Sequence, residues 1–205
     1  MTKLFLFDVD STLINEEVIE LIAAHAGVQD KVKDITDRAM AGELDFQSSL
    51  KERVSLLKGL PESVIDEVRE EITLTNGASE LISELQSQGH TVAVVSGGFT
   101  KVIAPLMASL KIENYLANTL GVEEGTLTGQ VVGEIIDRQA KATYLVKLKD
   151  LLNPIQTIAI GDGANDIDML KAADIGIAFC AKDALNDVAD VVIKKRDLRE
   201  ISNYL

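Results

Sequence analysis

Short apolar runs recur along the chain, separated by stretches with helical periodicity. The first run, residues 4–7, is continuously apolar and stops at Asp8, as expected of a strand buried on both faces of a parallel sheet. The stretches 77–88 and 140–152 carry apolar residues at i, i+3 and i+4 and are predicted to be helices. Further strands are predicted at 91–95, 157–160, 175–179 and 191–193, and one half of a surface hairpin at 126–132. This alternation predicts an α/β fold with a doubly wound, Rossmann-like, mostly parallel sheet.

Residues 14–75 have a different pattern, with no convincing strand and four helical patterns in succession. These patterns span residues 16–26, 30–41, 46–57 and 61–72, with breaks at Gly27, Gly42 and Gly59-Leu60-Pro61. Pro61 suits the first turn of its helix. We interpret residues 14–75 as a helical cap inserted into an α/β core made of residues 1–13 and 76–205. A cap inserted after the first strand is expected to cover the strand ends, where open α/β sheets bind ligands.

The net charge of the chain argues against some classes of binding partner. The chain has 205 residues, 46% of them hydrophobic, and a formal net charge of −13. This charge argues against nucleic acid or an anionic membrane as a partner, and an anionic substrate would need cations concentrated at its site. The single cysteine, Cys180, excludes an intramolecular disulfide and fits a reducing compartment. No secretory or membrane-spanning segment is visible at the N-terminus, so we expect a cytoplasmic protein.

The segment Asp8-Val9-Asp10-Ser11-Thr12 directly follows the first predicted strand. Two acids at i and i+2 on a loop can aim at one point. One carboxylate can attack phosphorus while it coordinates Mg²⁺, and the second can protonate the leaving oxygen and then activate water. By itself, the motif is equally compatible with a helix N-cap or a turn.

A second acidic segment, Gly161-Asp162-Gly163-Ala164-Asn165-Asp166, ends another apolar strand. Its oxygen ligands suit Mg²⁺, and Asp162 is the expected partner of Asp8, with Asn165 or Asp166 completing or supporting the site. The alternative is a turn in which Asp166 caps the following helix. That alternative explains Asp162 less well, because two acidic segments would then end two strands by coincidence.

Two further segments could hold a phosphate. Ser96, Gly97 and Gly98 lie between a strand and a helix, where a hydroxyl and backbone N–H groups form an anion site, although a tight turn would look the same. Lys141, near the start of the helix at 140–152, could reach a phosphate above the strand ends and offset the charge of Asp8. Arg138 is its local competitor.

Together these four motifs match, in order and context, those of the haloacid dehalogenase superfamily of phosphatases. Over essentially its whole length the chain resembles the phosphoserine phosphatase branch of that superfamily. The resemblance implies that Asp8 is the nucleophile and Asp10 the general acid and base. It also implies Mg²⁺ held by the Asp8 side chain, the Asp10 carbonyl and Asp162, supported by Asn165 and Asp166. The phosphoryl group would be bound by Ser96, Gly97 and Lys141.

The same resemblance assigns roles in the cap. Glu17 is similar to the residue that meets the substrate ammonium, and Arg53 to the one that pairs with its carboxylate, while Met40 and Phe46 would close over the substrate. A Glu and an Arg could instead be ordinary surface charges, and Glu16 could be confused with Glu17. The implied reaction hydrolyses O-phosphoserine to serine and phosphate through an aspartyl-phosphate, the last step of serine biosynthesis.

Other functions remain open at this point. The same chemistry could serve another small phosphorylated metabolite or pass the phosphoryl group to an alcohol. A phospho-acceptor receiver module also uses strand-end acids and a lysine, but it needs neither the helical insertion nor Asp10. His25 and His90 have no partner at ligand spacing, and Cys180 is expected to be buried rather than nucleophilic. The sequence leaves the oligomeric state open, a homodimer included.

Overall fold

Across the residues that the structure describes, the fold is built on one sheet of seven strands. The computed structural model describes residues 2–41 and 43–204, and of Met40 only the backbone. The strands are β1 (Leu4–Phe7), β2 (Thr91–Phe99), β3 (Asn114–Glu123), β4 (Thr126–Val132), β5 (Thr157–Gly161), β6 (Ile175–Phe179) and β7 (Val191–Ile193). Their order is β4-β3-β2-β1-β5-β6-β7, and every pair is parallel except β3 with β4. The α/β fold predicted from the apolar pattern is confirmed.

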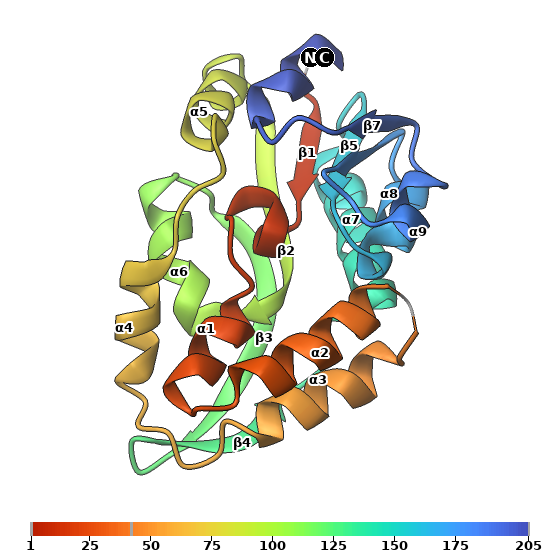
Figure 1. The fold of residues 1–205 in the computed structure, drawn as a ribbon. Coiled ribbons are helices and arrows are strands. Elements are labelled where there is room, and N and C mark those ends of the chain that lie inside the picture. The colour runs from red at the N-terminus through yellow and green to blue at the C-terminus, as the bar shows by residue number, and fades with distance from the viewer. Residues whose placement is uncertain (1, 42, 205) are drawn as a thin grey trace.

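Helices cover both faces of this sheet (Figure 1). They are α5 (Ala78–Ser87), α6 (Thr100–Ser109), α7 (Arg138–Leu152), α8 (Ile167–Ala172) and α9 (Asp183–Asn186). Because successive strand residues face opposite sides, Phe5 and Phe7 join one apolar core with α5 and α6. Leu4 and Leu6 join a second core with α7 and α8. Burial on both faces explains why the run at residues 4–7 is continuously apolar.

The order of the strands reverses at β1, which pairs with β2 on one side and β5 on the other. Phe7, the last residue of β1, lies opposite Val94 of β2 and Ile160 of β5. Open α/β sheets bind ligands at such a reversal, beyond the carboxyl ends of the strands. Asp8 and Asp162, which directly follow β1 and β5, therefore lie at the point where the topology favours a site.

The described part of residues 14–75, which omits residue 42, contains four helices: α1 (Val18–His25), α2 (Gln29–Met40), α3 (Phe46–Ser55) and α4 (Val64–Glu71). The chain leaves and re-enters the core at one place, because Ile14 forms a bridge with Leu74 and the Thr75 amide donates to the Leu13 carbonyl at 3.0 Å. In Figure 1, α1, α2 and α3 lie beyond the end of β1. We therefore propose that residues 14–75 form a helical cap inserted into the α/β core. None of the helices in the described residues is long and apolar enough to cross a bilayer.

The hairpin of β3 and β4 extends to the cap and accounts for two departures from the sequence pattern. The strand β3 was not predicted, because most of its residues are only partly buried and its sequence mixes polar and apolar positions. The cap segment before α4 pairs with the hairpin: Leu127 accepts from the Gly59 amide and donates to the Leu60 carbonyl, at 2.9 and 2.8 Å. Pro61 forms a bridge with Thr126, and α4 begins only at Val64. The prediction that Pro61 lies in the first turn of its helix was wrong, since this backbone is used for pairing.

Candidate active site

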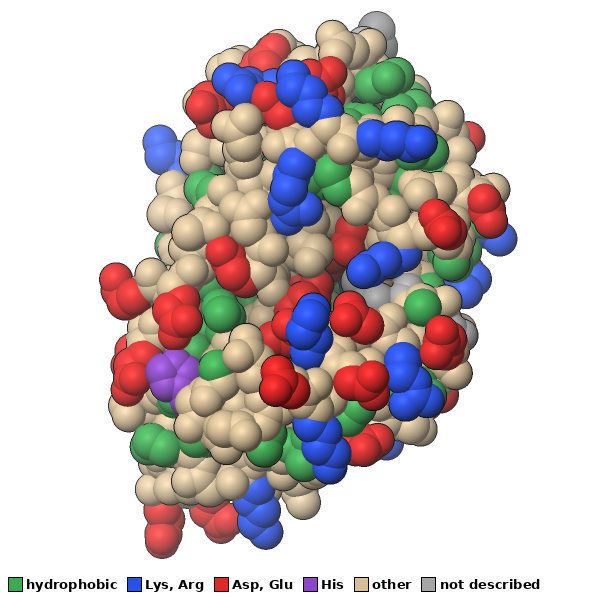
Figure 2. All heavy atoms as spheres, viewed as in Figure 1, with side chains coloured by type: hydrophobic (Ala, Val, Ile, Leu, Met, Phe, Trp, Pro, Cys, Tyr) green, Lys and Arg blue, Asp and Glu red, His purple; other side chains and the backbone are tan. Residues whose placement is uncertain are grey.

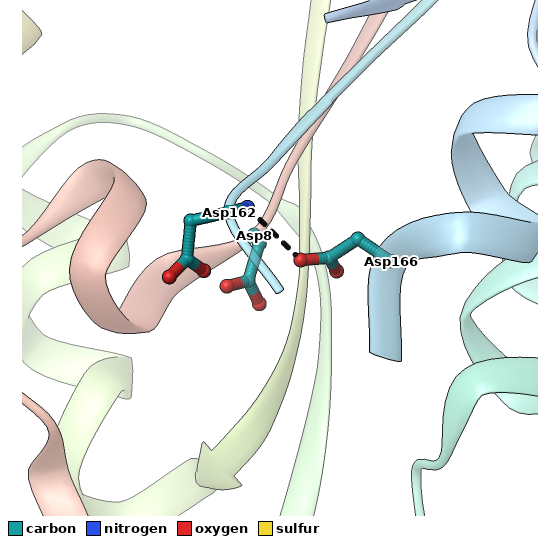
Figure 3. Close-up of side chains that lie close together, drawn as sticks. All are labelled: Asp8, Asp162 and Asp166. Atoms are coloured by element: carbon teal, nitrogen blue, oxygen red, sulfur yellow. Dashed lines mark hydrogen bonds between the residues drawn. The ribbon is translucent and has the colours of Figure 1, made fainter. Parts of the chain in front are cut away.

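Three carboxylates from separate positions in the chain meet beyond the strand ends. Asp8 follows β1, Asp162 follows β5, and Asp166 ends a short 3₁₀ turn (Ala164–Asp166) before α8. One oxygen from each lies within 4.8 Å of the others, and the three side chains point toward a common region (Figure 3). Their exposed fractions are 3%, 3% and 0%. The expected neighbourhood of Asp8 and Asp162 is present in the structure, and Asp166 is a full member of the group.

Lys141 places one ammonium among these carboxylates. Its Nζ lies 2.6 Å from Asp8 Oδ1 and 2.7 Å from Asp166 Oδ1, and its side chain is completely buried. The competitor Arg138, three residues earlier on α7, instead pairs with the partly exposed Asp168. The structure therefore puts Lys141, and not Arg138, next to the candidate nucleophile.

Asp166 also holds the loop that carries Asp162. Its Oδ2 accepts hydrogen bonds from the amides of Asp162 and Gly163, both at 3.1 Å. A Cβ on Gly161 would lie 2.4 Å from Asp166 Cγ, so the close packing of this carboxylate requires glycine there. The side chain of Asp166 makes no capping hydrogen bond to α8, and instead bonds the loop that precedes it and Lys141.

Asp10 and Ser11 lie in the turn after Asp8. Asp10 Oδ1 is buried and has no hydrogen-bond partner among the described residues. A Cβ on Gly98 would lie 3.2 Å from Asp10 Oδ2, so the end of β2 runs directly against this carboxylate. Ser11 has a φ of +56°, which is uncommon for a residue with a side chain. The turn is thus held in a strained conformation beside the carboxylates, as is frequent at functional sites.

Burial and mutual repulsion raise the pKa values of the acids in this cluster. Burial, together with the charge of Asp166, raises the pKa of Asp8 to about 7, although Lys141 acts in the opposite sense. Burial and neighbouring carboxylates also raise the pKa of Asp10 and of Asp162 well above the usual range. The cluster therefore carries more negative charge than Lys141 neutralises.

A divalent cation fits this site. Asp162 Oδ1 is buried without a hydrogen-bond partner in the part of the chain that the structure describes, and such an oxygen is costly unless something binds it. Mg²⁺ prefers carboxylate oxygens, and a buried cation would offset the excess charge. The donor atoms of Asp8, Asp162 and Asp166 thus suit a hard metal ion.

The opposite side of the pocket is formed by the cap. Glu17, directly before α1, accepts a hydrogen bond from Ser11 Oγ at 2.6 Å, and burial raises its pKa. Glu16 points elsewhere, since it accepts from the Thr73 amide at 2.9 Å. Of the two glutamates, Glu17 is therefore the one that lines the pocket.

Arg53 of α3 is a buried cation in the same pocket, with 5% of its surface exposed. It donates from Nε to the Ser49 carbonyl at 3.2 Å and from Nη1 to Thr36 Oγ1 at 3.0 Å. No ion pair within 4.0 Å includes Arg53 in the described residues. Burial lowers the pKa of this guanidinium. The charges of Glu17, Asp10 and Glu20 act on it in the opposite sense from beyond ion-pair distance, so the guanidinium is available for a direct ion pair with an anionic group of a ligand.

The pocket between these two sides is lined by cap and core together. Its lining residues are Asp8, Asp10, Glu17, Ile19, Ala39, Phe46, Leu50, Arg53, Gly97, Gly98 and Asn165. Figure 2 shows acidic side chains at the bottom of a hollow on this face of the molecule.

The predicted binding residues take different places around this pocket. A Cβ on Gly97 would lie 3.0 Å from the Phe46 ring, so the cap closely approaches β2 at this point. Ser96 is buried, and its Oγ accepts from the Gly98 amide at 2.8 Å. Ser96, Gly97 and Gly98, which were expected to lie between a strand and a helix, are the last part of β2, which runs to Phe99. The side chain of Met40 lies outside the described residues.

Several contacts in and near the site had no signal in the sequence. The hydroxyls of Ser11 and Thr36, which bond Glu17 and Arg53, belong to residue types that are common everywhere. The expectation of a buried Cys180 was wrong: it is partly exposed just after β6, with its Sγ 3.5 Å from the Lys194 carbonyl. The chain turns there with a φ of +47°, which brings the residue to the surface.

Comparison with known proteins agrees with this geometry. A family model described as haloacid dehalogenase-like hydrolase matches residues 5–171. The chain belongs to this hydrolase family. Among curated members, the chain is 49% identical over 205 residues to "Phosphoserine phosphatase" of Methanocaldococcus jannaschii, covering 99% of this chain and 97% of that one.

Two solved structures of the haloacid dehalogenase-like hydrolases resemble this chain over its whole length. One is titled "Substrate bound phosphoserine phosphatase complex structure" and has a TM-score of 0.97, 48% identity, and coverage of 100% of this chain and 99% of that one. The other, titled "Phospho-Aspartyl Intermediate Analogue of Phosphoserine phosphatase", has a TM-score of 0.96 with the same identity and coverage.

Proposed function

We propose that this hydrolase is a magnesium-dependent phosphoserine phosphatase that forms an aspartyl-phosphate on Asp8. The proposal rests on two groups of charged residues that lie at different ends of one pocket. At one end Asp8 lies against Lys141, and at the other Glu17 and Arg53 present opposite charges without forming an ion pair within 4.0 Å, among the described residues. Phosphoserine has a phosphate, an ammonium and a carboxylate, and each would meet a complementary group.

Asp8 and Asp10 divide the chemical steps between them. An Asp8 oxygen attacks phosphorus, and the bond from phosphorus to the serine oxygen breaks, while Asp10 gives a proton to that oxygen. Water then attacks the phosphorus of the aspartyl-phosphate, Asp10 takes a proton from it, and the bond to the Asp8 oxygen breaks. The raised pKa of Asp10 suits a carboxyl that must hold a proton near neutral pH.

Other side chains bind and orient the phosphoryl group. Lys141 faces Asp8 directly, and Gly97 offers backbone at the pocket wall, with Ser96 and Asn165 beside it. A positive group fixed before the reaction stabilises the charge that spreads over the phosphoryl oxygens. Mg²⁺, held by Asp8, Asp162 and the Asp10 carbonyl with Asp166 in support, would neutralise further charge on those oxygens.

The cap would select the substrate. We assign Arg53 to the substrate carboxylate and Glu17 to its ammonium, and Phe46, which lies against Gly97, to closing the pocket together with Met40. The apolar Ile19 and Leu50 line the same pocket as Arg53 and would lower the local polarity in which its guanidinium binds a carboxylate. We also propose that the protein is cytoplasmic and catalyses the last step of serine biosynthesis, in line with its single cysteine and its net charge of −13.

A phosphate-release screen over phosphorylated metabolites, with Mg²⁺ or with EDTA, tests this proposal. We expect O-phosphoserine to have the highest kcat/KM and EDTA to abolish turnover. A clear preference for another metabolite would overturn the substrate assignment. Transfer to added alcohols in competition with water would indicate a phosphotransferase, and a single turnover without release would indicate a receiver-like protein.

A further inference from the structure

One hydroxyl from a neighbouring helix holds the head of Arg53. The Nε contact to the Ser49 carbonyl, at 3.2 Å, is made within α3 and fixes only the inner part of the guanidinium. The Nη1 contact to Thr36 Oγ1, at 3.0 Å, is made to α2. It is therefore this second contact that ties the orientation of the head to the neighbouring helix.

The direction of this hydrogen bond is fixed by the backbone of α2. Thr36 Oγ1 donates its only proton to the Val32 carbonyl at 2.9 Å. Its lone pairs are then left to accept, and an arginine can only donate. With 2% of its surface exposed, Thr36 is also shielded from water that could replace it. The hydroxyl oxygen can therefore act only as a hydrogen-bond acceptor toward Arg53.

This acceptor leaves part of the guanidinium free for a ligand. A guanidinium has five N–H groups in one plane, of which the contacts to Ser49 and Thr36 use two. Within the described residues no further hydrogen bond of Arg53 is formed, and the residue lines the pocket. Pairing with a carboxylate through two parallel bonds requires that this plane be held at the correct angle.

We propose that Thr36 is a positioning residue for recognition of the substrate carboxylate, acting through Arg53. This inference rests on the proposed function. The hydroxyl does not touch the substrate: it fixes the plane of the guanidinium before the substrate arrives, so that binding does not require its reorientation. A valine at this position would keep the shape of the side chain and remove the hydroxyl, with its bonds to Arg53 and to the Val32 carbonyl.

Thr36→Val tests the proposal with two substrates that differ in one group. O-phosphoserine carries the carboxylate, and O-phosphoethanolamine has the same phosphate ester and ammonium without it. A hydrogen bond to a charged group is worth roughly a tenfold change or more, so we expect kcat/KM for phosphoserine to fall by about that factor, mainly through KM. The value for phosphoethanolamine should change less than about twofold. Thr36→Ser, which keeps the hydroxyl, should restore the wild-type ratio.

Two further variants separate positioning from a structural role. Thr75→Val changes another buried threonine, outside the pocket and with no hydrogen-bond partner for its hydroxyl among the described residues, and it should leave the substrate ratio unchanged. In an Arg53→Ala background, Thr36→Val should cause no further loss in the ratio, because the two act as one unit.

The outcomes distinguish this inference from the proposed function. An unchanged ratio in Thr36→Val, or equal losses for both substrates, would overturn the role of Thr36 while the Arg53→Ala ratio still falls. If Arg53→Ala does not alter the ratio, or wild type does not prefer phosphoserine, the substrate assignment itself is wrong and the inference falls with it.

Discussion

Lys141 Nζ lies 2.6 Å from Asp8 Oδ1, and both side chains are buried although 133 positions separate them in the sequence. The ammonium opposes the burial and the Asp166 charge that raise the pKa of Asp8 to about 7. Lys141 therefore lowers the pKa of the proposed nucleophile and increases the fraction of Asp8 that is ionised at neutral pH.

Replacing Lys141 by methionine should reduce kcat at pH 7 by at least about 100-fold. Without the ammonium the pKa of Asp8 rises further, so the remaining activity should increase toward higher pH, where Asp8 is ionised. The pH profile of kcat measures this shift. Arg138→Met removes a cation from the same helix whose partner, Asp168, is partly exposed, and this variant should keep the wild-type profile. A Lys141→Met profile with an unchanged midpoint would contradict the electrostatic role.

Asp8→Asn should abolish turnover while the protein remains folded. The amide is nearly isosteric with the carboxylate but is not a nucleophile, so no covalent phosphoenzyme should accumulate. Mass spectrometry of enzyme quenched during turnover measures the phosphorylated form, and circular dichroism checks the fold. Asp168→Asn, at a partly exposed aspartate of α8, is the matched control and should retain activity. Turnover by Asp8→Asn at the wild-type rate would refute the assignment of the nucleophile.

The meeting of Asp8 and Asp162 could be predicted from the sequence because it depends only on the topology of the sheet. Asp8 and Asp162 each follow an apolar strand, and the ends of neighbouring parallel strands share one edge of the sheet. Once the strands are recognised, the meeting of the two carboxylates follows without knowledge of any side-chain conformation. Lys141 could be placed near them for the same reason, since α7 precedes β5 and covers the sheet.

The contacts that orient the cap residues could not be predicted in this way. Whether Thr36 faces Arg53 depends on how α2 is rotated about its axis relative to α3. The apolar pattern of each helix shows which broad face is buried but does not give this rotation. The strand β3 was missed because its sequence mixes polar and apolar positions and only three of its ten residues are buried, so it lacks a continuous apolar run. Its role in holding the cap was missed with it.

Glu17→Gln should reduce activity on substrates that carry an ammonium. The amide keeps the size of the side chain but removes the negative charge, so we expect kcat/KM for O-phosphoserine to fall by about tenfold or more. 3-Phosphonooxypropanoate, which keeps the phosphate ester and the carboxylate of phosphoserine at the same carbons and lacks only the ammonium, should be affected much less. Glu16→Gln changes the neighbouring glutamate, which bonds to Thr73, and should leave both values near wild type. Equal effects of the two variants would rule out Glu17 as the ammonium site.

The acids of the centre also predict how stability depends on pH and metal. The pKa of Asp8 is about 7 in the folded protein, against an ordinary value of 3.8. Between these values the folded state binds a proton that the unfolded state has lost, so the contribution of Asp8 to stability is greatest at low pH and declines as the pH rises to about 7. Burial raises the pKa of Asp162 in the same direction.

We therefore expect the Tm of the protein in EDTA to fall between pH 5 and pH 8, and added Mg²⁺ to raise it more at pH 8, where protons no longer compete for the carboxylates. At 100 times the Kd, binding contributes about 2.7 kcal/mol, or roughly 5–11 °C for a chain of this size. Scanning calorimetry at constant ionic strength measures both effects. Asp162→Asn should raise the Tm in EDTA at pH 8 and lose most of the gain from Mg²⁺, whereas Asp168→Asn should behave as wild type. A gain from Mg²⁺ that is equal at both pH values would show that these buried carboxylates do not hold the ion.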